Sequence, residues 1–471
     1  MDRGWRRSGT LLYMPDVSRS CCPHYTIRYE QQLCSKVSIK VLNHINRLPS
    51  ADFKPSRDQR QALNRWNRFV LGDKYIQELE RKHPKTKAEK KAQESYFNLP
   101  TTVHASELST LKPDIIPEHN FAVTLEPDTF TEEKYALFAN YQKHVHHEQG
   151  SEISRPGFKR FLCSSPLHRH PDPADGKDLG SYHQCYRLDG RLIALAVLDR
   201  LPHAVSGVYF LYHSDFAKWS FGKLSALREA ALAGEGGYRY YYMGYYIHSC
   251  KKMRYKGDYR PQYVLDYASG GWDVLDQEMR GCMEGRGWAS MSRERARKER
   301  NGAGVSAEEE GESEERAVNA NGTATALSTP VPSSGEQAAD ATTRDDHDEL
   351  EDDTDELVLH PTPTAACASG LSLLELGMPG ILTLEEVLGR VDLDAMKLFL
   401  GGKGGDVHEM RDLVSWGEED DDDGDGDGDG DDRPLPQQLK RMSGMMKTIA
   451  EFAAVVGSEV ARGIVVDFSR G

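Results

Sequence analysis

The sequence has no long hydrophobic run, and this absence excludes a helix that crosses a bilayer. It contains 471 residues with 28% charged side chains and a mean hydropathy of −0.63. None of its apolar stretches approaches the ~18–20 residues that a membrane span requires. Its first nine residues include three arginines and few apolar side chains, so we expect no secretory leader. Eight cysteines are too few for a disulfide scaffold, which predicts a reducing compartment, the cytoplasm or the nucleus.

Two further signatures are missing. The sequence has no G-x-S-x-G motif, which argues against a serine nucleophile of the hydrolase type. Five histidines between positions 144 and 170 have no accompanying C-x-x-C pair, so a zinc site is not predicted there.

The negative net charge hides a basic part of the chain. The formal net charge is −15, yet residues 308–356 carry −15 and residues 418–432 carry −11, which leaves +11 for the remainder. Residues 1–95 contain twenty Lys and Arg against ten Asp and Glu. A basic folded part attracts polyanions, of which nucleic acid is the commonest in a cell. Charge alone fits a solvated basic surface equally well.

A helix is predicted within a small basic N-terminal domain, residues 1–95. Ser56 and Gln59 form an S-x-x-Q capping box, Leu63 and Trp66 follow at helical spacing, and Gly72 stands where a C-terminal cap is expected. The opposite face carries a stripe of arginines: Arg60, Arg65 and Arg68.

Residues 96–275 alternate strand and helix patterns. Strands are predicted at 121–125, 182–187, 192–198, 205–212 and 240–243, and helices at 131–146 and 220–234. Asp189 and Gly190 predict a hairpin turn, because a type I′ turn needs positive φ. The order is that of an α+β protein with an acyltransferase-type sheet, one of several folds that the pattern allows.

The rest of the chain is expected to be partly disordered. Residues 290–360 have almost no aromatic side chains and cannot bury enough apolar surface to fold, which predicts a disordered acidic insert. A C-terminal extension, 361–471, contains the low-complexity acidic run 418–432. Its last helix has an apolar face, including Met446 and Ile449, that is predicted to pack.

Several strings are long and specific: Asp2–Gly9, Cys21–Arg28, Phe53–Ser56, Leu63–Phe69, Gly180–Gln184, Tyr186–Gly190, Tyr240–Cys250 and Lys252–Gly257. In this order they resemble the eukaryotic arginyl-tRNA–protein transferases over roughly residues 1–270. The acidic insert and the tail resemble fungal members.

The resemblance implies an enzyme that moves arginine from arginyl-tRNA to the N-terminal α-amine of proteins beginning with Asp, Glu or oxidised Cys. The new arginine then marks the protein for ubiquitin-dependent degradation. The family's catalytic domain is a GNAT-type fold that accepts aminoacyl-tRNA instead of acetyl-CoA. We expect a monomer with arginyl-tRNA and acidic N-termini as its partners.

The resemblance also implies an iron–sulfur cluster held by a C-x-x-C pair and a Cys-Cys pair. Cys21 and Cys22 match the second pair, and the first pair is absent from the sequence. Two adjacent thiolates cannot complete a four-cysteine site, so we expect an N-terminally truncated form without the cluster. The transfer chemistry itself requires no cofactor.

The implied reaction selects candidate residues. Because the aminoacyl ester is already activated, the protein must position the amine, stabilise an oxyanion and move one proton. Tyr242 and His248 are the candidates for the proton. The arginyl group needs a carboxylate, for which Asp199 and Asp258 are the candidates.

Cations are needed for the acidic acceptor and for the tRNA. The candidates for binding the acceptor's carboxylate are Arg254, Lys256, Lys252 and His24. The tRNA phosphate candidates are Arg60, Arg65, Arg68, Arg6 and Arg7. A solvated helix face and an exposed basic loop remain open alternatives for these sets.

Two other functions stay open. An acetyl-CoA-dependent N-acetyltransferase would place pyrophosphate at a helix start such as that of Gly222, but the full glycine pattern is missing. A catalytically inactive RNA-binding form is the other alternative.

Overall fold

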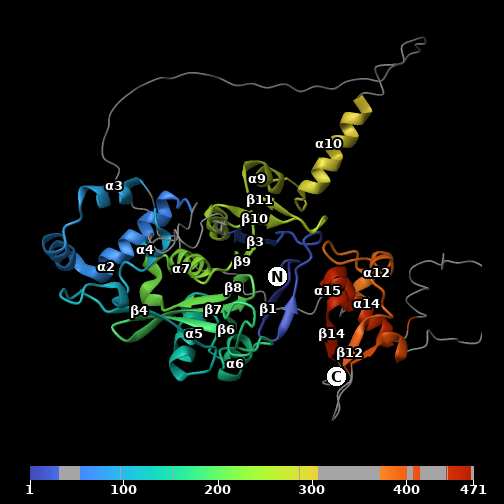
Figure 1. Cartoon of the computed structure of the whole chain (residues 1–471), viewed down its shortest axis with the longest axis horizontal. Coiled ribbons are helices and arrows are strands. Elements are labelled where there is room, and N and C mark those ends of the chain that lie inside the picture. Colours follow the sequence, from blue (N-terminus) through green and yellow to red (C-terminus); the bar gives the residue numbers. More distant parts are fainter. Residues whose placement is uncertain are drawn as a thin grey trace, which may run out of the picture. The chain divides into compact units, whose positions relative to one another are not determined.

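Among the described residues, a nine-stranded mixed sheet forms the centre of the fold (Figure 1). Its main path runs β11-β10-β3-β9-β8-β7-β6-β4, and β5 pairs with β6 beside this path. Within this sheet, neighbouring strands are antiparallel except for β8 and β9, which are parallel. The strands are β3 (Tyr25–Glu30), β4 (Phe121–Pro127), β5 (His170–Pro171), β6 (Asp178–Leu188), β7 (Arg191–Leu201), β8 (Ala204–Tyr212), β9 (Tyr240–Tyr246), β10 (Gln262–Leu265) and β11 (Trp272–Val274). The predicted α+β class is confirmed.

The structure is a computed structural model that describes residues 1–30, 53–95, 97–150, 152–285, 287–305, 372–399, 407–413, 442 and 444–467. Residues 1–292 and 353–471 make up one compact unit, and residues 293–352 make up a second. Both acidic segments, 308–356 and 418–432, lie outside the described residues. Within the described ranges, no helix combines the length and apolar content needed to span a bilayer.

The predicted hairpin between β6 and β7 is confirmed. Asp189 and Gly190 have φ of 50° and 85°, the left-handed values that the tight turn requires. β7 pairs with β6 and β8, and its residues 192–199 are all buried. A strand covered on both faces needs the continuous apolar run seen in this sequence.

The N-terminal segment belongs to the same sheet. β3 lies between β9 and β10, so the predicted domain boundary at residue 95 falls inside one compact unit. A small hairpin precedes β3 and consists of β1 (Arg6–Ser8) and β2 (Leu11–Tyr13).

Helix α2 (Arg57–Lys82) begins as predicted and ends later. Ser56 accepts a hydrogen bond from the Gln59 amide, and the Gln59 side chain accepts one from the Ser56 amide. Gly72 has φ 76° and ψ 153°, so it kinks the helix, which then resumes to Lys82. Trp66 packs on Phe121 of β4 with ring centroids 5.1 Å apart. The glycine therefore interrupts the helix instead of ending it.

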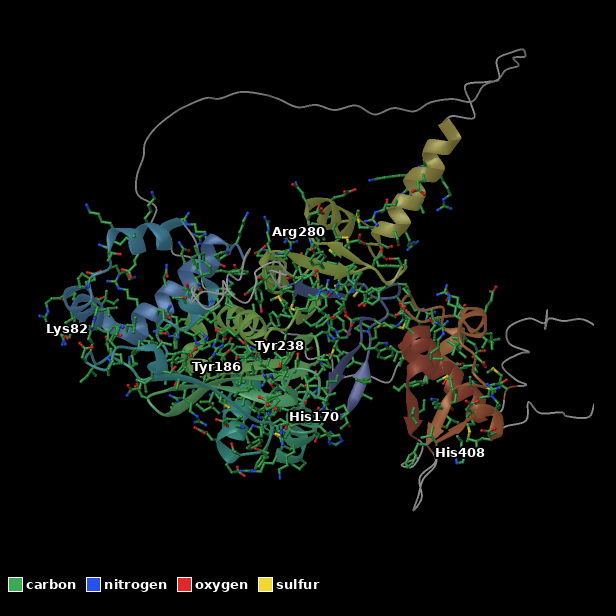
Figure 2. The ribbon with its side chains drawn as sticks, in the orientation of Figure 1. Lys82, His170, Tyr186, Tyr238, Arg280 and His408 are labelled. Carbon is green, nitrogen blue, oxygen red and sulfur yellow. The ribbon has the colours of Figure 1, made fainter. Side chains whose placement is uncertain are left out.

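Further helices surround the sheet. In Figure 1, α7 lies on one side of β6 to β8, and α5 and α6 lie on the other. Tyr186 and Tyr238, labelled in Figure 2, are buried in the core between sheet and helices. The helices are α3 (Lys87–Ser95), α4 (Leu99–Val103), α5 (Glu132–His144), α6 (Arg155–Leu162), α7 (Phe221–Glu235), α8 (Lys251–Arg254) and α9 (Gln277–Met283), with 3₁₀ turns η1 (Leu108–Thr110), η2 (Ser214–Trp219) and η3 (Tyr255–Asp258).

The start of the predicted disordered insert is helical instead. α10 (Met291–Val305) occupies these residues. Arg, Lys, Glu and Ala dominate its sequence and are strong helix formers, so the lack of apolar residues does not prevent a helix.

The C-terminal extension packs around a second hydrophobic core, which it shares with residues from earlier in the chain. Its small sheet has the order β13-β12-β14. Met446 and Ile449 of α14 are buried, as predicted for its apolar face, and the same core includes Met14 and Tyr267. The elements are η4 (Leu373–Glu375), α12 (Leu384–Arg390), β12 (Lys397–Phe399), β13 (Val407–Glu409), η5 (Met410–Asp412), α14 (Gly444–Val456), α15 (Ser458–Gly463) and β14 (Val465–Asp467).

Candidate active site

Strands β8 and β9 separate part-way along their length. They pair in parallel from Ala204–Tyr240 to Ser206–Tyr242, whereas β8 continues to residue 212 and β9 to residue 246. Helix α7 connects the two strands. Beyond the last pair, no pairing joins the described residues of the two strands, and two pockets lie at this divergence.

Backbone irregularities in both strands redirect side chains around the divergence. In β8, Val208 is the extra residue of a β-bulge opposite β7. In β9, Gly244 has φ 74°, which residues with a Cβ rarely adopt. Tyr242 and Tyr245 therefore face the same side although they are three residues apart, and the Arg6 guanidinium lies 5.4 Å from each ring centroid. Bulges of this kind commonly aim side chains next to active sites.

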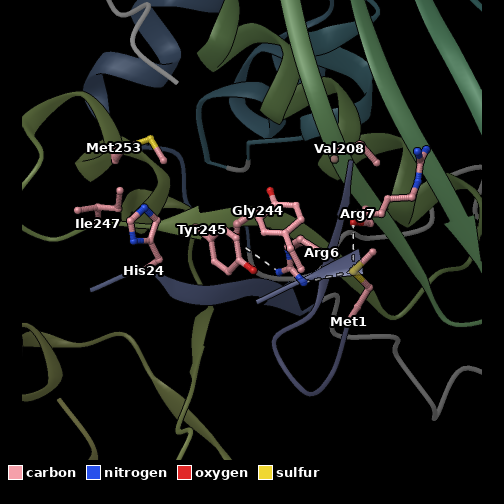
Figure 3. A pocket seen from close by; sticks show the side chains of 12 residues that line it. Met1, Arg6, Arg7, His24, Val208, Gly244, Tyr245, Ile247 and Met253 are labelled. Carbon is pink, nitrogen blue, oxygen red and sulfur yellow. Dashed lines mark hydrogen bonds between the residues drawn. The ribbon is translucent and has the colours of Figure 1, made fainter. Parts of the chain in front are cut away.

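Pocket 1 lies on the side of the divergence that the N-terminal segment covers (Figure 3). It is a hollow of about 540 Å³ that opens to solvent. The N-terminal segment contributes Arg6 and His24 to its lining, and the diverging strands contribute Gly207, Gly244 and Tyr245. Pocket 1 thus joins residues that are distant in the sequence.

Arg6 gives pocket 1 a positive charge. Its side chain is buried and donates to the backbone oxygens of Trp5 (2.9 Å) and Gly244 (3.4 Å), while its Nε has no hydrogen-bond partner. Among the described residues, no carboxylate forms an ion pair with it. His24 is also buried, packs edge-on against Tyr245, and has no hydrogen bond at either ring nitrogen. Buried donors with unused capacity suit an anionic ligand.

Pocket 2 lies on the α7 side of the divergence and contains a buried carboxylate. It is a hollow of about 680 Å³ that includes open solvent, and its lining includes Tyr209, Tyr241, Glu229 and Lys256. The Tyr241 hydroxyl donates to Glu229 at 2.6 Å. Burial and the nearby Glu229 charge hold the pKa of Tyr241 well above its usual value, so this hydroxyl stays protonated. Pocket 1 therefore contains a buried arginine, whereas pocket 2 contains a buried glutamate together with Lys256.

Arg7 and Asp199, predicted to bind tRNA and the arginyl group, bind each other. Arg7 Nε and Nη2 each donate to one Asp199 oxygen at 2.6 Å, and both side chains are fully buried. Ser181 donates a third hydrogen bond to the same carboxylate. Asp258, the other candidate for the arginyl group, is half-exposed and lies 3.5 Å from Arg280. None of these residues presents a free charge to either substrate.

The cationic loop predicted to grip the acceptor is divided between two places. Arg254 is exposed, donates to the His248 backbone oxygen at 2.8 Å, and lines a separate hollow beside Cys21. Lys256 is buried in pocket 2, with Nζ 3.5 Å from the Tyr245 backbone oxygen. The side chain of Lys252 lies outside the described residues. The structure therefore does not bring Arg254 and Lys256 to one carboxylate.

The two predicted proton-transfer residues are also apart. The Tyr242 hydroxyl is buried and donates to Asp2, and burial together with that carboxylate raises the pKa of Tyr242. His248 lies beside Arg254, with Nδ1 2.8 Å from the Tyr246 hydroxyl. Burial and the Arg254 charge lower the pKa of His248, so it is neutral at pH 7.

The arginine face of α2 is exposed as predicted. Arg65 also donates to the Lys218 backbone oxygen at 2.7 Å, and Arg68 lies 2.9 Å from Asp73. α2 contacts both η2 and α7, so this face adjoins the start of α7, where Gly222 lines pocket 2. Its exposed arginines are Arg60, Arg65 and Arg68.

The described residues do not fit a complete iron–sulfur site. Cys21 and Cys22 have sulfur atoms 3.9 Å apart at the surface. Across the described part of the chain, no group of three or more His, Cys, Asp or Glu is arranged to hold a metal ion. A cluster needs about four such ligands, so no step of the chemistry is assigned to one.

Glu229 is the pocket residue that the sequence patterns do not single out. One signal was present: it is a charged residue among the apolar positions 224, 227, 230 and 231 of α7, all on or near its buried side. Such a residue is expensive to bury and is therefore worth attention in a sequence.

Two family models match the chain. One is described as "Arginine-tRNA-protein transferase, C terminus" and matches residues 133–266. The other is described as "Arginine-tRNA-protein transferase, N terminus" and matches residues 1–36. The lining of pocket 1 comes from both matched segments, and that of pocket 2 comes from the longer one.

Curated relatives agree with these matches. "Arginyl-tRNA--protein transferase 1" of Saccharomyces cerevisiae is 32% identical over 284 residues, which are 56% of this chain and 47% of the yeast protein. The Arabidopsis thaliana protein of the same name is 42% identical over 152 residues, 30% of this chain and 24% of that protein. "Aspartate/glutamate leucyltransferase" of Stutzerimonas stutzeri is 36% identical over 167 residues, 35% of this chain and 65% of that protein.

The chain spans less than half the length of these two eukaryotic relatives. The matches nevertheless cover both segments that line the pockets, and they confirm the resemblance predicted from the sequence. Residues 1–36 and 133–266 thus match models of the arginine-tRNA-protein transferase family.

Proposed function

We propose that this chain transfers arginine from arginyl-tRNA to the N-terminal α-amine of proteins that begin with Asp, Glu or oxidised Cys. The observation that carries the proposal is a pair of pockets on the two sides of one strand divergence, one with the buried Arg6 and one with the buried Glu229, lined by the segments that match the family. The reaction would take place in the cytoplasm or nucleus, and its product would be marked for ubiquitin-dependent degradation.

The fold supports an acyl transfer of the acetyltransferase type. The order β4-α5-α6-β6-β7-β8-α7-β9, the bulge in β8 and the divergence of β8 from β9 resemble the GNAT arrangement. In the proposed reaction, the acceptor's α-nitrogen forms an amide bond with the arginyl carbonyl carbon and the ester C–O bond breaks. The proton lost from the nitrogen goes to the released ribose hydroxyl of the tRNA. The protein supplies position and charge, with no covalent intermediate.

Pocket 1 is the proposed site for the acidic acceptor. The Arg6 guanidinium is held by backbone carbonyls and by two tyrosine rings, so its geometry is fixed before a ligand arrives. A carboxylate that entered pocket 1 would meet a desolvated cation, where an ion pair is stronger than at the surface. His24 would add a hydrogen bond from its unbonded ring.

The α2 face is the proposed path of the tRNA. Its exposed arginines adjoin the start of α7, and α7 forms one wall of pocket 2. Phosphate contacts along this face would position the acceptor stem without reading its sequence. The aminoacyl end would then reach the divergence from the α7 side, opposite to the acceptor.

A transfer assay tests the proposal. The full chain is incubated with labelled arginyl-tRNA and with peptides that begin with Asp or with Ala, and labelled acetyl-CoA serves as the alternative donor. Transfer of arginine to the Asp peptide alone is the expected result. Acetyl transfer, or tRNA binding without any transfer, would replace this function with another.

Arg6→Gln tests the acceptor pocket. A hydrogen bond to a charged group contributes about 1.5–3 kcal/mol, so kcat/KM for the Asp peptide should fall roughly 10- to 100-fold. The same constant for an Asn peptide should change far less, because the lost interaction requires a negative charge. Arg155→Gln removes an exposed arginine that pairs with Glu132 and serves as the matched control. Equal losses for both peptides would assign Arg6 a purely structural role.

A further inference from the structure

Glu229 places a buried carboxylate at the point where β8 and β9 separate. It is 4% exposed, and its two oxygens accept hydrogen bonds from Ser225 and Tyr241. A Cβ added to Gly207, the first β8 residue beyond the paired segment, would lie 3.0 Å from Glu229 Oε2. The Glu229 carboxylate therefore packs against the backbone of Gly207 at the divergence. A larger side chain at position 207 would occupy the same space.

Burying this carboxylate costs free energy, because its charge leaves water. The positions around Glu229 on α7 are apolar and pack into the main core. A leucine or glutamine there would avoid the cost of taking a charge out of water. A buried acid retained at the wall of an open pocket therefore points to a ligand of opposite charge.

The walls of pocket 2 suit a flat cation. Tyr141, Tyr209, Tyr212 and Tyr241 contribute aromatic rings or hydroxyls to the lining. A guanidinium stacks on aromatic faces and meets a carboxylate with two parallel hydrogen bonds, which a compact ammonium does not do. Pocket 2 opens to solvent, so the ester end of an arginyl group would extend outward from it.

Each pocket contains buried charge. Arg6 lies in pocket 1, and Glu229 and Lys256 both line pocket 2, where the Lys256 ammonium lies 3.9 Å from where a Cβ on Gly244 would be. We infer that Glu229 binds the guanidinium of the arginyl group and thereby selects arginine as the transferred residue. The inference rests on the proposed function, and it takes over the role for which Asp199 and Asp258 were the sequence candidates.

Neutral donors test this selection directly. The tRNA is charged with arginine or with citrulline, which has the shape of arginine without its charge, and kcat/KM is measured with the full chain and an Asp peptide. The wild-type chain should prefer the arginyl donor at least about 10-fold. Glu229→Gln should lower the arginyl constant 10- to 100-fold and leave the citrullyl constant within about threefold. Glu229→Asp, which keeps the charge on a shorter side chain, should retain an intermediate preference.

Glu235→Gln is the matched control. It removes a carboxylate from the same helix at a position that binds His104 instead of lining pocket 2, so the donor preference should not change. Equal wild-type use of both donors, or an unchanged preference in Glu229→Gln, would overturn the inference while the proposed function stood. No arginine transfer by the wild-type chain would overturn the proposed function itself. The wild-type donor ratio needs no variant, so a failure of Glu229→Gln to fold leaves the test intact.

Discussion

Replacing Arg7 by glutamine should leave the buried Asp199 carboxylate without its ion-pair partner. The two side chains are 2% and 0% exposed, and two hydrogen bonds of 2.6 Å join the guanidinium to the carboxylate. Ser181 alone would remain as a partner for Asp199 from this set. Breaking a buried pair by removing one member typically costs about 3–5 kcal/mol, because a charge is left without compensation. That is a fifth or more of the stability of a typical domain, about 5–15 kcal/mol.

Urea unfolding followed by tryptophan fluorescence measures this loss. The matched control is Arg155→Gln, which breaks an equally well-formed pair with Glu132 whose members are 58% and 64% exposed. An exposed pair contributes at most about 1 kcal/mol, so the control should barely shift the midpoint. Arg7→Met combined with Asp199→Leu should recover part of the loss, since no charge is then left buried.

Equal unfolding free energies for Arg7→Gln and Arg155→Gln would contradict the buried pairing. In that case Arg7 and Asp199 would again be available to the tRNA and the arginyl group. The experiment therefore separates the structural role of this pair from the two binding roles that the sequence suggested.

Two more predictions concern His104 and the arginine face of α2. Hydrogen bonds to Glu107 and then Glu235 raise the pKa of His104 to about 9, above the unfolded value of 6.5. The associated stability is thus fully present below pH 6.5 and is lost as pH rises through 9; after a discount for partial exposure it amounts to about 1 kcal/mol. The unfolding free energies of the wild-type chain and of His104→Gln should therefore differ by that amount at pH 6 and should be equal at pH 10. An equal difference at both pH values would refute the assignment. Arg65→Gln with Arg68→Gln should reduce the slope of log K for tRNA binding against log salt by roughly 1.5, since each phosphate contact contributes about 0.7–0.9. An unchanged slope would mean that this face is simply solvated.

Elements specified by local sequence were predictable. The β6–β7 hairpin depends on two adjacent residues, Asp189 and Gly190, and the start of α2 depends on Ser56 and Gln59. The continuation of α2 beyond Gly72 was not predictable from local sequence. The chain on both sides of the kink is helical and packs on its surroundings. The position of β3 between β9 and β10 was also out of reach, since strand order depends on pairing between distant segments.

The candidate site shows the same division. Residue types could be chosen from the chemistry, but their pairing could not, because Arg7 and Asp199 are 192 positions apart. Arg6 and Arg7 are adjacent and both line pocket 1, yet only Arg7 is neutralised by a buried carboxylate. Glu229 was missed because a single acid in a helix carries no motif. Its meaning comes from the divergence of β8 and β9, which only the fold provides.

A structure of the chain with both substrates bound tests the account most directly. The ligands would be an Asp-initiated peptide and a stable arginyl-adenosine analogue in which an amide replaces the ester. The guanidinium should lie within about 3 Å of the Glu229 carboxylate, and the peptide's first carboxylate should contact Arg6, with the α-nitrogen facing the arginyl carbonyl between β8 and β9. Both ligands on one side of the sheet, or either one away from the divergence, would contradict the account.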